Sequence, residues 1–423
     1  MIYPDRKHDS ERNTVITTTK GVRAATALIL GSTLIGGLAA CAPTESTGGG
    51  DNSTYTLWDP YPDRDASSTW AQAIDACATD LGITIERNSG NTGDTVKDLT
   101  TAAGNLPDLA MVDNPKVGTL ADAGLLTSNE ETGLDTSAIE PNILSAGELD
   151  GATYGVPVGA NTLGLYYNPT ILEAAGVDIA SVTDYASLTA ALEKVVASGA
   201  KGITFSAVGT EEGTFQFLPW FWGADADLTE LDSSQAESAL QLWTDWVTKG
   251  LAPNSVLSNT QGTSWDEFMT GEYAFAENGS WFKGAADEAG YLSIQVPGID
   301  GGAAPAPTGG EFITIPVQKD TARYETSTKI VECLTTGNAG ADALGYVAPT
   351  AEGQAAQLKA DPSLEFWISA VGDAKPRTAD NLGISYGIIS EQLYTAVQNA
   401  LSGVSSPADA LADAQAAAAD KLK

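Results

Sequence analysis

Short strand-like runs alternate with an amphipathic helix over residues 55–112, and this pattern constrains the fold more than any other feature of the chain. The runs at 55–58, 83–85 and 109–112 have the composition of strands, and apolar residues at Trp70, Ile74 and Cys77 predict a helix over 67–81. Strand, helix and strand in this order predict a parallel sheet. Ligands of such sheets bind beyond the carboxyl ends of the strands, where this chain has Trp58–Asp59 and Asp113–Asn114.

The rest of the chain continues the alternation of helices and strands. A strand is predicted over Gly202–Phe205, and helices are predicted over 183–199, 234–249, 391–401 and from Ser406–Pro407 onward. In the second of these helices the apolar stripe includes Trp243 and Trp246, so we expect both rings in the core. The Gly/Pro-rich segment 298–310 is either a surface loop or a crossover between domains.

Composition excludes several classes of function. The chain has 21 Lys and Arg against 55 Asp and Glu, a formal net charge of −34, which argues against nucleic acid or anionic lipid as a partner. Its single histidine, His8, lies near the N-terminus, in a segment that is predicted below to be a cleaved signal peptide. The chain that remains after cleavage cannot build a Ser-His-Asp triad, a Cys-His dyad or a His-ligated zinc site. We therefore interpret the G-x-S-x-G spacing around Ser385 as coincidence, and no phosphate-binding P-loop motif is present.

Two cysteines, Cys77 and Cys333, lie on the apolar faces of predicted helices. Outside the cytoplasm they can form a disulfide, and as two separately buried thiols they would serve only packing. The sequence leaves both alternatives open.

The N-terminus has the pattern of a secretion signal. Lys20 and Arg23 precede an apolar run that ends in Leu38-Ala39-Ala40-Cys41, which resembles the lipobox of bacterial lipoproteins. This resemblance implies a signal peptide over 1–40 and a lipid on Cys41. The Thr/Ser/Gly-rich residues that follow, up to 53, are predicted to be a flexible tether on the outer face of the cell membrane.

A series of motifs from 55 to the C-terminus resembles the extracellular solute-binding proteins of ABC importers, in the sugar-binding family that includes the maltose-binding protein. The motifs are YTLWD (55–59), GNLPDLAMVD (104–113), DGATYGVPVGANTLGLYYNPTILEAAGV (150–177), FMTGEYAFAENGSWF (268–282) and KPRT (375–378). The resemblance implies a two-lobe α/β fold of the type II periplasmic-binding-protein kind, with a hinge and a cleft between the lobes. It places crossings near 159–163 and 309–313. The expected N-terminal lobe is 54–160 plus 310–348, and the expected C-terminal lobe is 161–309 plus 349–423.

A carbohydrate site needs charged or polar groups for the hydroxyls and flat rings for the C–H faces. Charged candidates are Asp59, Asp113, Glu311 and Arg377; aromatic candidates are Trp58, Trp220, Trp222, Trp265, Trp281 and Tyr386. Trp281 is the preferred candidate, because it follows ENGS in a predicted loop and matches the family position near the ligand. No metal site is expected: Tyr166–Tyr167 has no histidine to join it, and the acidic run 225–232 lacks EF-hand spacing.

The sequence therefore predicts a lipid-anchored, monomeric, non-enzymatic binding protein without cofactor. It would deliver a mono- or oligosaccharide to the permease of an ABC importer. Two alternatives remain open: a polyamine or other cationic solute on the same fold, which the acidic composition permits, and a secreted glycoside hydrolase with paired carboxylates.

Overall fold

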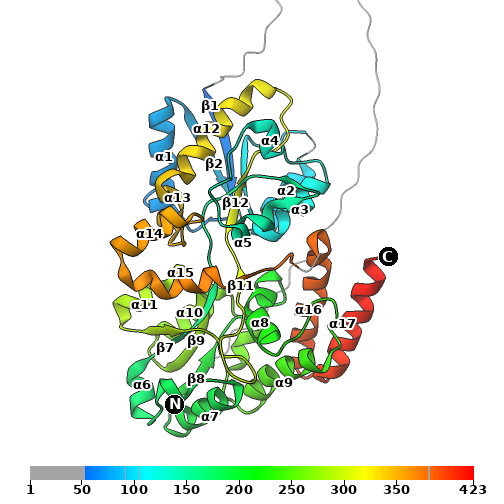
Figure 1. The fold of residues 1–423 in the computed structure, drawn as a ribbon. Helices are drawn as coiled ribbons and strands as arrows, with labels where there is room; N and C mark the ends of the chain where they lie inside the picture. Colours follow the sequence, from blue (N-terminus) through cyan, green and yellow to red (C-terminus); the bar gives the residue numbers. More distant parts are fainter. Residues whose placement is uncertain (1–52, 91, 103, 380–381) are drawn as a thin grey trace, which may run out of the picture. The chain divides into compact units, whose positions relative to one another are not determined.

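The computed structural model describes residues 53–90, 92–102, 104–379 and 382–423. The predicted signal peptide, the predicted lipidation site Cys41 and the tether up to residue 52 lie outside the described residues. Among the helices of these described ranges, none is long and apolar enough to cross a membrane. The described chain contains two main β-sheets of five and four strands, each flanked by helices (Figure 1).

The first lobe is the five-stranded sheet with the helices packed on it. Its strand order is β2-β1-β3-β12-β6, in which β1, β2 and β3 are parallel, as predicted, and β12 is antiparallel to both neighbours. The strands are β1 (Thr54–Asp59), β2 (Thr84–Ser89), β3 (Leu109–Asp113), β6 (Val156–Pro157) and β12 (Glu311–Thr314). The helices are α1 (Thr69–Leu81), α2 (Thr92–Thr101), α3 (Asn114–Asp122), α4 (Asn129–Thr132), α5 (Pro141–Leu144), α12 (Tyr324–Thr335) and α13 (Ala339–Leu344), and a small hairpin joins β4 (Glu148–Leu149) to β5 (Ala152–Thr153).

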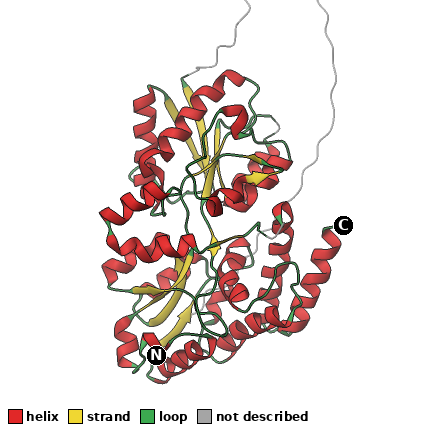
Figure 2. Cartoon of the chain, viewed as in Figure 1, coloured by secondary structure: helices red, strands yellow, loops and turns green. Residues whose placement is uncertain are grey.

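The second lobe is the four-stranded sheet with its own helices (Figure 2). The strand order is β10-β7-β9-β8, with β7 antiparallel to both neighbours and β8 parallel to β9. The strands are β7 (Leu163–Tyr167), β8 (Lys201–Thr204), β9 (Tyr273–Gly279) and β10 (Leu292–Ile294). The helices are α6 (Pro169–Ala174), α7 (Tyr185–Ala197), α8 (Glu211–Gly223), α9 (Ser234–Thr248), α10 (Gln261–Met269), α11 (Lys283–Ala289), α15 (Glu365–Gly372), α16 (Tyr386–Leu401) and α17 (Pro407–Lys421). Between α13 and α15 lies α14 (Ala351–Ala360).

Helix caps and apolar stripes explain where several helices form. Ser68 caps α1, and Gly82 ends it in the left-handed conformation at φ 66°. In α9 the predicted stripe is confirmed, since Trp243 and Trp246 are fully buried. For α7 the structure corrects the predicted start: Asp184, rather than Thr183, is the N-cap, because its carboxylate accepts from the Ser187 N–H in a capping box.

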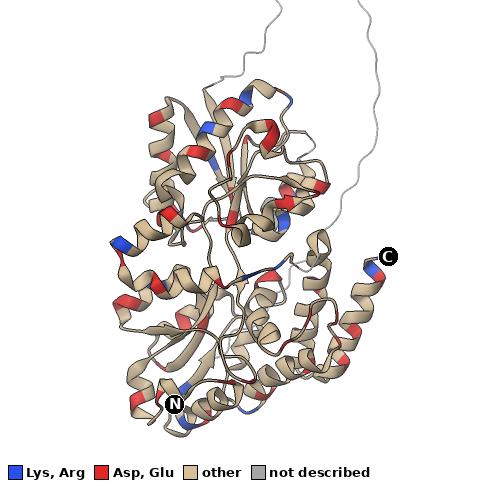
Figure 3. Cartoon of the chain, viewed as in Figure 1, with Lys and Arg blue, Asp and Glu red and all other residues tan. Residues whose placement is uncertain are grey.

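Three connecting segments lie side by side between the two sheets. The backbone of Ala160 exchanges hydrogen bonds with Val347, and Asn161 exchanges them with Gly309. The sequence predicts crossings at 159–163 and 309–313. The first segment joins β6 of the first sheet to β7 of the second sheet. The second segment joins β12 of the first sheet to β11 (Pro307–Thr308), which forms a short pair with β13 (Lys375–Pro376). Asp and Glu residues occur on helices of both lobes (Figure 3).

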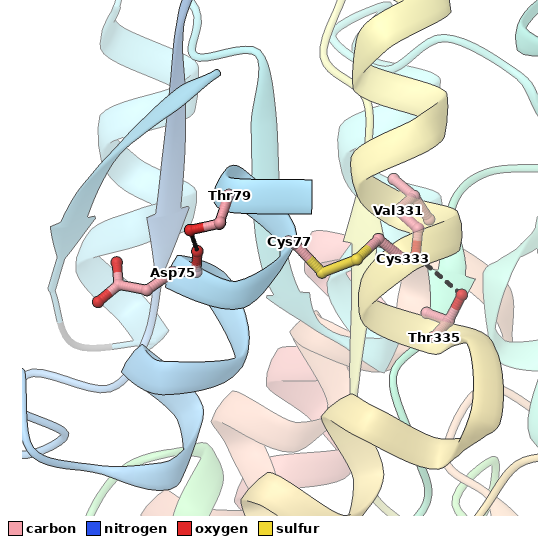
Figure 4. The surroundings of a disulfide bond; sticks show 6 residues. All are labelled: Asp75, Cys77, Thr79, Val331, Cys333 and Thr335. Atoms are coloured by element: carbon pink, nitrogen blue, oxygen red, sulfur yellow. Dashed lines mark hydrogen bonds between the residues drawn. A yellow bond between two sulfur atoms is a disulfide. The ribbon is translucent and has the colours of Figure 1, made fainter. Parts of the chain in front are cut away.

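A disulfide joins Cys77 of α1 to Cys333 of α12 (Figure 4). Their Cα atoms are 5.9 Å apart, and 256 positions separate the two residues along the chain. Of the two alternatives that the sequence leaves open, the structure therefore has the disulfide. It links two helices of the first lobe that belong to distant parts of the chain.

Candidate functional site

The edge of the first sheet that leads into the connecting segments carries three of the predicted site residues. Asp59 ends β1, Asp113 ends β3, and Glu311 begins the antiparallel β12, so all three lie at the same edge. This is the edge at which ligands of α/β sheets bind. The predicted carboxylates are therefore gathered in one region, although their surroundings differ.

The carboxylate of Asp59 accepts hydrogen bonds only from described residues of its own lobe. Its carboxylate is completely buried and accepts hydrogen bonds from the Trp70 indole N–H at 2.9 Å, from the Tyr61 backbone N–H at 3.1 Å and from the Arg87 guanidinium. Arg87 also donates to the backbone carbonyls of Arg64 and Tyr61. Asp59 therefore fixes the loop that follows β1, and its predicted contact with a solute has no support in its surroundings.

Glu311 is held by two tyrosines that the sequence analysis did not select. Tyr61 Oη donates to Glu311 Oε2 at 2.6 Å, Tyr346 Oη donates to the same oxygen at 3.0 Å, and the two hydroxyls are 3.3 Å apart. Within the described part of the chain, no donor reaches Oε1. Burial, together with the charge of Asp113, raises the pKa of Glu311 to about 7, and the two tyrosines and Arg377 oppose this rise.

Arg377 joins carboxylates of the two lobes. Its Nη1 donates to Asp113 Oδ2 at 2.9 Å and to Glu211 Oε1 at 2.7 Å, and its Nη2 donates to Asp113 Oδ1 at 2.5 Å and to Asn114 Oδ1 at 3.0 Å. The guanidinium carbon lies 4.8 Å from the ring centre of Phe215. Burial alone would lower the pKa of Arg377, but Asp113 and Glu211 outweigh it and raise the pKa. Nε has no hydrogen-bond partner among the described residues.

The second lobe completes this network at the first turn of α8. Glu211 accepts from Tyr386 Oη at 2.7 Å and from the hydroxyl of Ser390. Tyr386 is fully buried, and burial and the charge of Glu211 raise its pKa well above the ordinary value. Arg377 and Tyr386, both predicted to contact a solute, therefore point to protein carboxylates. The structure brings together Asp113, Glu311, Arg377 and Tyr386, and adds Glu211 and Asn114.

Trp281 lies at the boundary between the lobes. It follows β9 of the second lobe, in the 3-10 turn Ser280–Phe282, and its half-buried side chain packs against the hydrophobic cluster of the first lobe. Tyr61 packs against the same cluster, to which Tyr346 belongs. The preferred aromatic candidate thus shares its surroundings with the two tyrosines that hold Glu311.

Each of the other candidate tryptophans packs within a single lobe, three of them in the second lobe and Trp58 in the first. Trp220 is fully buried in the core of the second lobe, where its indole N–H donates to Glu277 Oε2 at 2.8 Å. Trp265 stacks on Phe282 with ring centres 4.6 Å apart. Trp222 is 5% exposed, with Lys375 Nζ 5.2 Å from its ring centre, and half-buried Trp58 packs on the cluster around α3. These positions do not join the group around Glu311.

Tyr61, Tyr346 and Glu211 were not selected from the sequence, which placed Asn114 at a strand end without making it a candidate site residue. Asn114 directly follows the strand end at Asp113, and Tyr61 lies two residues after the strand end at Asp59, so both positions carried a signal. Tyr346 and Glu211 carried no such signal, because each reaches the site from a distant part of the chain.

No metal site is found in the described ranges, since no group of three or more His, Cys, Asp or Glu there lies close enough together to hold a metal ion.

Several solved structures share this fold. A solute-binding protein of an ABC transporter from Thermotoga lettingae bound with α-D-tagatose has a TM-score of 0.76 at 23% identity, covering 88% of this chain and all of the other. The GacH receptor of Streptomyces glaucescens, solved unliganded and with acarbose, has a TM-score of 0.74 at 22% identity, covering 86% and 97%. UgpB of Mycobacterium tuberculosis in complex with glycerophosphocholine has a TM-score of 0.74 at 16% identity, covering 87% and 98%.

Comparison of sequences gives the family. Binding proteins of Brucella abortus and Brucella suis are 27% identical over 177 residues; the match covers 39% of this chain, which spans 40% of the length of these curated relatives. The family model described as bacterial extracellular solute-binding protein matches residues 72–366, more than half of the chain. The chain therefore belongs to the bacterial extracellular solute-binding proteins.

Proposed function

We propose that this solute-binding protein of an ABC importer captures a carbohydrate, a mono- or oligosaccharide, between its two lobes and presents it to the permease. As a member of its family it binds a solute and is not an enzyme. The carbohydrate is our inference, and so are the lobe boundaries 54–160 plus 310–348 and 161–309 plus 349–423. Closure of the lobes on the solute would supply the state that the permease recognises, because the solute binds the closed state more tightly.

One observation carries this proposal: Glu311 and Trp281 come from different lobes and meet the same cluster of side chains. Glu311 Oε2 is fixed by Tyr61 and Tyr346, and no donor of the described residues reaches Oε1, which leaves that oxygen for a hydroxyl of the solute. Trp281 packs on the cluster that includes Tyr346 and offers a flat ring for C–H surface. An acceptor, two hydroxyls and a ring are the groups that a sugar needs.

The proposed site therefore differs from the sequence-based one. We retain Trp281, Glu311 and Asp113 and add Tyr61 and Tyr346. Arg377 and Tyr386 are assigned to the ion-pair network that joins the lobes beside the site. Trp220 and Trp265 are left out, since each is at least 95% buried within the second lobe.

A thermal-shift screen followed by calorimetry tests the solute. The protein is mixed with maltose, D-tagatose, acarbose and longer malto-oligosaccharides, one at a time. A ligand at about a hundredfold its Kd adds ~2.7 kcal/mol of stability, a shift that is easily measured. A complete sugar panel without any shift would contradict the carbohydrate assignment.

Two variants then test the site with the sugar that binds. Trp281→Ala should abolish binding in a folded protein, whereas Phe366→Ala should leave the affinity unchanged. Phe366 is a matched control because it is also a half-buried aromatic residue of the second lobe, packed edge-on against Trp367 on α15. Equal affinity of the Trp281→Ala variant and the wild type would remove Trp281 from the site.

A cationic solute is the second candidate, because the carboxyl groups of Asp113 and Glu311 lie opposite one another at the site and a cation bound beside them would relieve their repulsion. Spermidine and putrescine belong in the same screen for this reason, and glycerophosphocholine is added as a zwitterion that carries a quaternary ammonium group. Binding of a cation should weaken steeply as salt is added, whereas binding of a neutral sugar should hardly respond. The salt dependence of the first ligand found decides between the two candidates.

We also propose that Cys41 carries the lipid anchor on the outer face of the membrane. The proposal rests on the sequence that precedes this cysteine. The Cys41→Ser variant should appear in the soluble fraction and lose incorporation of labelled palmitate, while a Ser46→Ala variant in the adjacent tether should stay with the membrane. Membrane association of both variants would contradict the anchor.

A further inference from the structure

Gly279, the last residue of β9, occupies a position where any side chain would collide with the indole ring of Trp281. A Cβ atom built on Gly279 would lie 2.0, 2.2 and 2.4 Å from three ring carbons of Trp281. Real Cβ atoms essentially never approach other atoms so closely. The ring of Trp281 therefore lies directly on the backbone of Gly279.

The glycine is required by space and not by backbone conformation. Gly279 has φ −94° and ψ 169°, values that any residue adopts. Its N–H donates to Asn278 Oδ1 at 2.9 Å, and its carbonyl accepts from Tyr166 Oη at 2.8 Å. Because both backbone groups are held, the chain at Gly279 cannot move aside to make room for a methyl group.

The turn that carries Trp281 is held by further contacts. The next residue, Phe282, stacks on Trp265 of α10 with an interplanar angle of 5°, which fixes the turn that carries Trp281. The Trp281 side chain packs against the hydrophobic cluster of the first lobe, and its Cα and carbonyl oxygen lie 3.9 Å from a Cβ built on Gly345. The half-buried indole thus contacts both the end of β9 and the cluster of the first lobe.

We propose that Gly279 is a positioning residue that sets the orientation of the Trp281 ring for contact with the solute. The proposal rests on the proposed function, in which Trp281 stacks on a carbohydrate. Gly279 acts through Trp281, because its lack of a side chain lets the ring lie against β9. A methyl group at this position turns the ring away from β9, and the stacking surface is lost.

The position of the ring is measurable without a solute. In the full chain labelled with 5-fluorotryptophan, the nine tryptophans give separate ¹⁹F resonances, and Trp281→Phe identifies the Trp281 resonance by its loss. We expect Gly279→Ala to shift the Trp281 resonance more than any other. Gly284→Ala is the matched control, since Gly284 is five residues further along, in α11, and a Cβ there meets nothing within 4 Å. An unshifted Trp281 resonance in Gly279→Ala would overturn the proposal.

A second arm separates steric positioning from a general loss of stability. Gly279→Ala should lower the urea midpoint in the wild-type background and change it little in a Trp281→Leu background, where the ring is gone. An equal loss in both backgrounds would overturn the proposal, because the collision would then not involve Trp281. This arm also needs no solute.

The solute arm uses maltose and D-tagatose by calorimetry. Where either binds the wild type, Gly279→Ala should weaken it about tenfold, the size of a lost aromatic contact, and Gly284→Ala should not. Unchanged affinity with a shifted Trp281 resonance would overturn the role of Gly279 in binding while the proposed function stands. Failure of both sugars to bind the wild type would count against the proposed function, and the ¹⁹F and urea measurements would still decide whether Gly279 positions the ring.

Discussion

Asp113 and Glu311 lie directly opposite one another in the antiparallel pair of β3 and β12. Two carboxyl groups in this arrangement repel each other when both are ionised. Burial and this repulsion raise the pKa of Glu311 to about 7, while Asp113 accepts two hydrogen bonds from the guanidinium of Arg377. Glu311 therefore changes its charge near neutral pH.

The first prediction concerns the pH dependence of stability. Because the pKa of Glu311 is higher in the folded chain than in the unfolded chain, the folded state keeps its proton longer, and stability is lost as pH rises from about 4.5 through about 7. Glu311→Gln should equal the wild type near pH 4 and exceed its free energy of unfolding at about pH 8 by roughly 1–3 kcal/mol. Urea unfolding at a series of pH values measures the difference.

Glu325→Gln is the control for this prediction. Glu325 is exposed, and its hydrogen bond and ion pair with Lys329 lower its pKa. The Glu325→Gln variant should therefore not gain free energy of unfolding relative to the wild type as the pH increases. Parallel pH profiles for the wild type and Glu311→Gln would show that Glu311 does not titrate in this range.

The second prediction concerns the ion-pair network of Arg377. Arg377→Met leaves the carboxylates of Asp113 and Glu211 without their shared partner in a buried region and should lower the free energy of unfolding by about 3–5 kcal/mol. Adding Asp113→Asn to this variant should restore part of the loss, because one of the unpaired charges is then gone. Urea unfolding near pH 7 is the measurement, and an unchanged midpoint for Arg377→Met would contradict the network.

The third prediction concerns Glu277, a fully buried carboxyl group of β9. Trp220 donates to Oε2, Oε1 has no partner among the described residues, and burial raises the pKa well above its ordinary value. The folded state therefore keeps this proton, and stability falls as pH rises above about 4.5. Glu277→Gln keeps the acceptor for Trp220 and should raise stability at about pH 8 by roughly 1–3 kcal/mol.

Glu277→Leu is the companion variant. It leaves the buried indole N–H of Trp220 without an acceptor and should cost about 1–3 kcal/mol relative to Glu277→Gln. Urea unfolding at about pH 5 and pH 8 compares the three proteins. A Glu277→Gln variant that is less stable than the wild type at the higher pH would show that the carboxylate is ionised and held by other groups.

The fourth prediction concerns the disulfide between Cys77 and Cys333. Serine at both positions should lower the free energy of unfolding by about 2–5 kcal/mol, because the bond closes a long stretch of chain and restricts the unfolded state. A reductant should reproduce the loss in the wild type and have no effect on the double variant. A reductant that leaves the wild-type urea midpoint unchanged would contradict a stabilising role for the bond.

Local signals in the sequence were sufficient to predict much of the fold. The stripe of Trp70, Ile74 and Cys77 predicted α1, and Ser406 with Pro407 predicted the start of α17, whose first turn Ser406 caps. Such patterns depend only on residues within a few turns of each other. The two-lobe fold and the family followed from the order of longer motifs and were confirmed by the solved structures and the family model.

The candidate site was less predictable, because its residues come from distant segments. Tyr61 and Tyr346, which hold Glu311, are 285 positions apart, and no local pattern relates them. The orientation of the tryptophans of α8 could not be predicted for another reason. This helix is buried on all sides, so it has no polar face from which the orientation of Trp220 could be inferred, and Trp220 lies in the core.

The bond between α1 and α12 also imposes an order of events on a chain that is made from its N-terminus. The disulfide of Cys77 cannot form until Cys333 has been synthesised. Likewise, the sheet lacks the strand between β3 and β6 until β12 has been synthesised. By then the strands and most helices of the second lobe have already been synthesised. The lobe that begins the polypeptide therefore cannot be completed until most of the second lobe has been made, and until then its half-built sheet leaves one side of β3 unpaired.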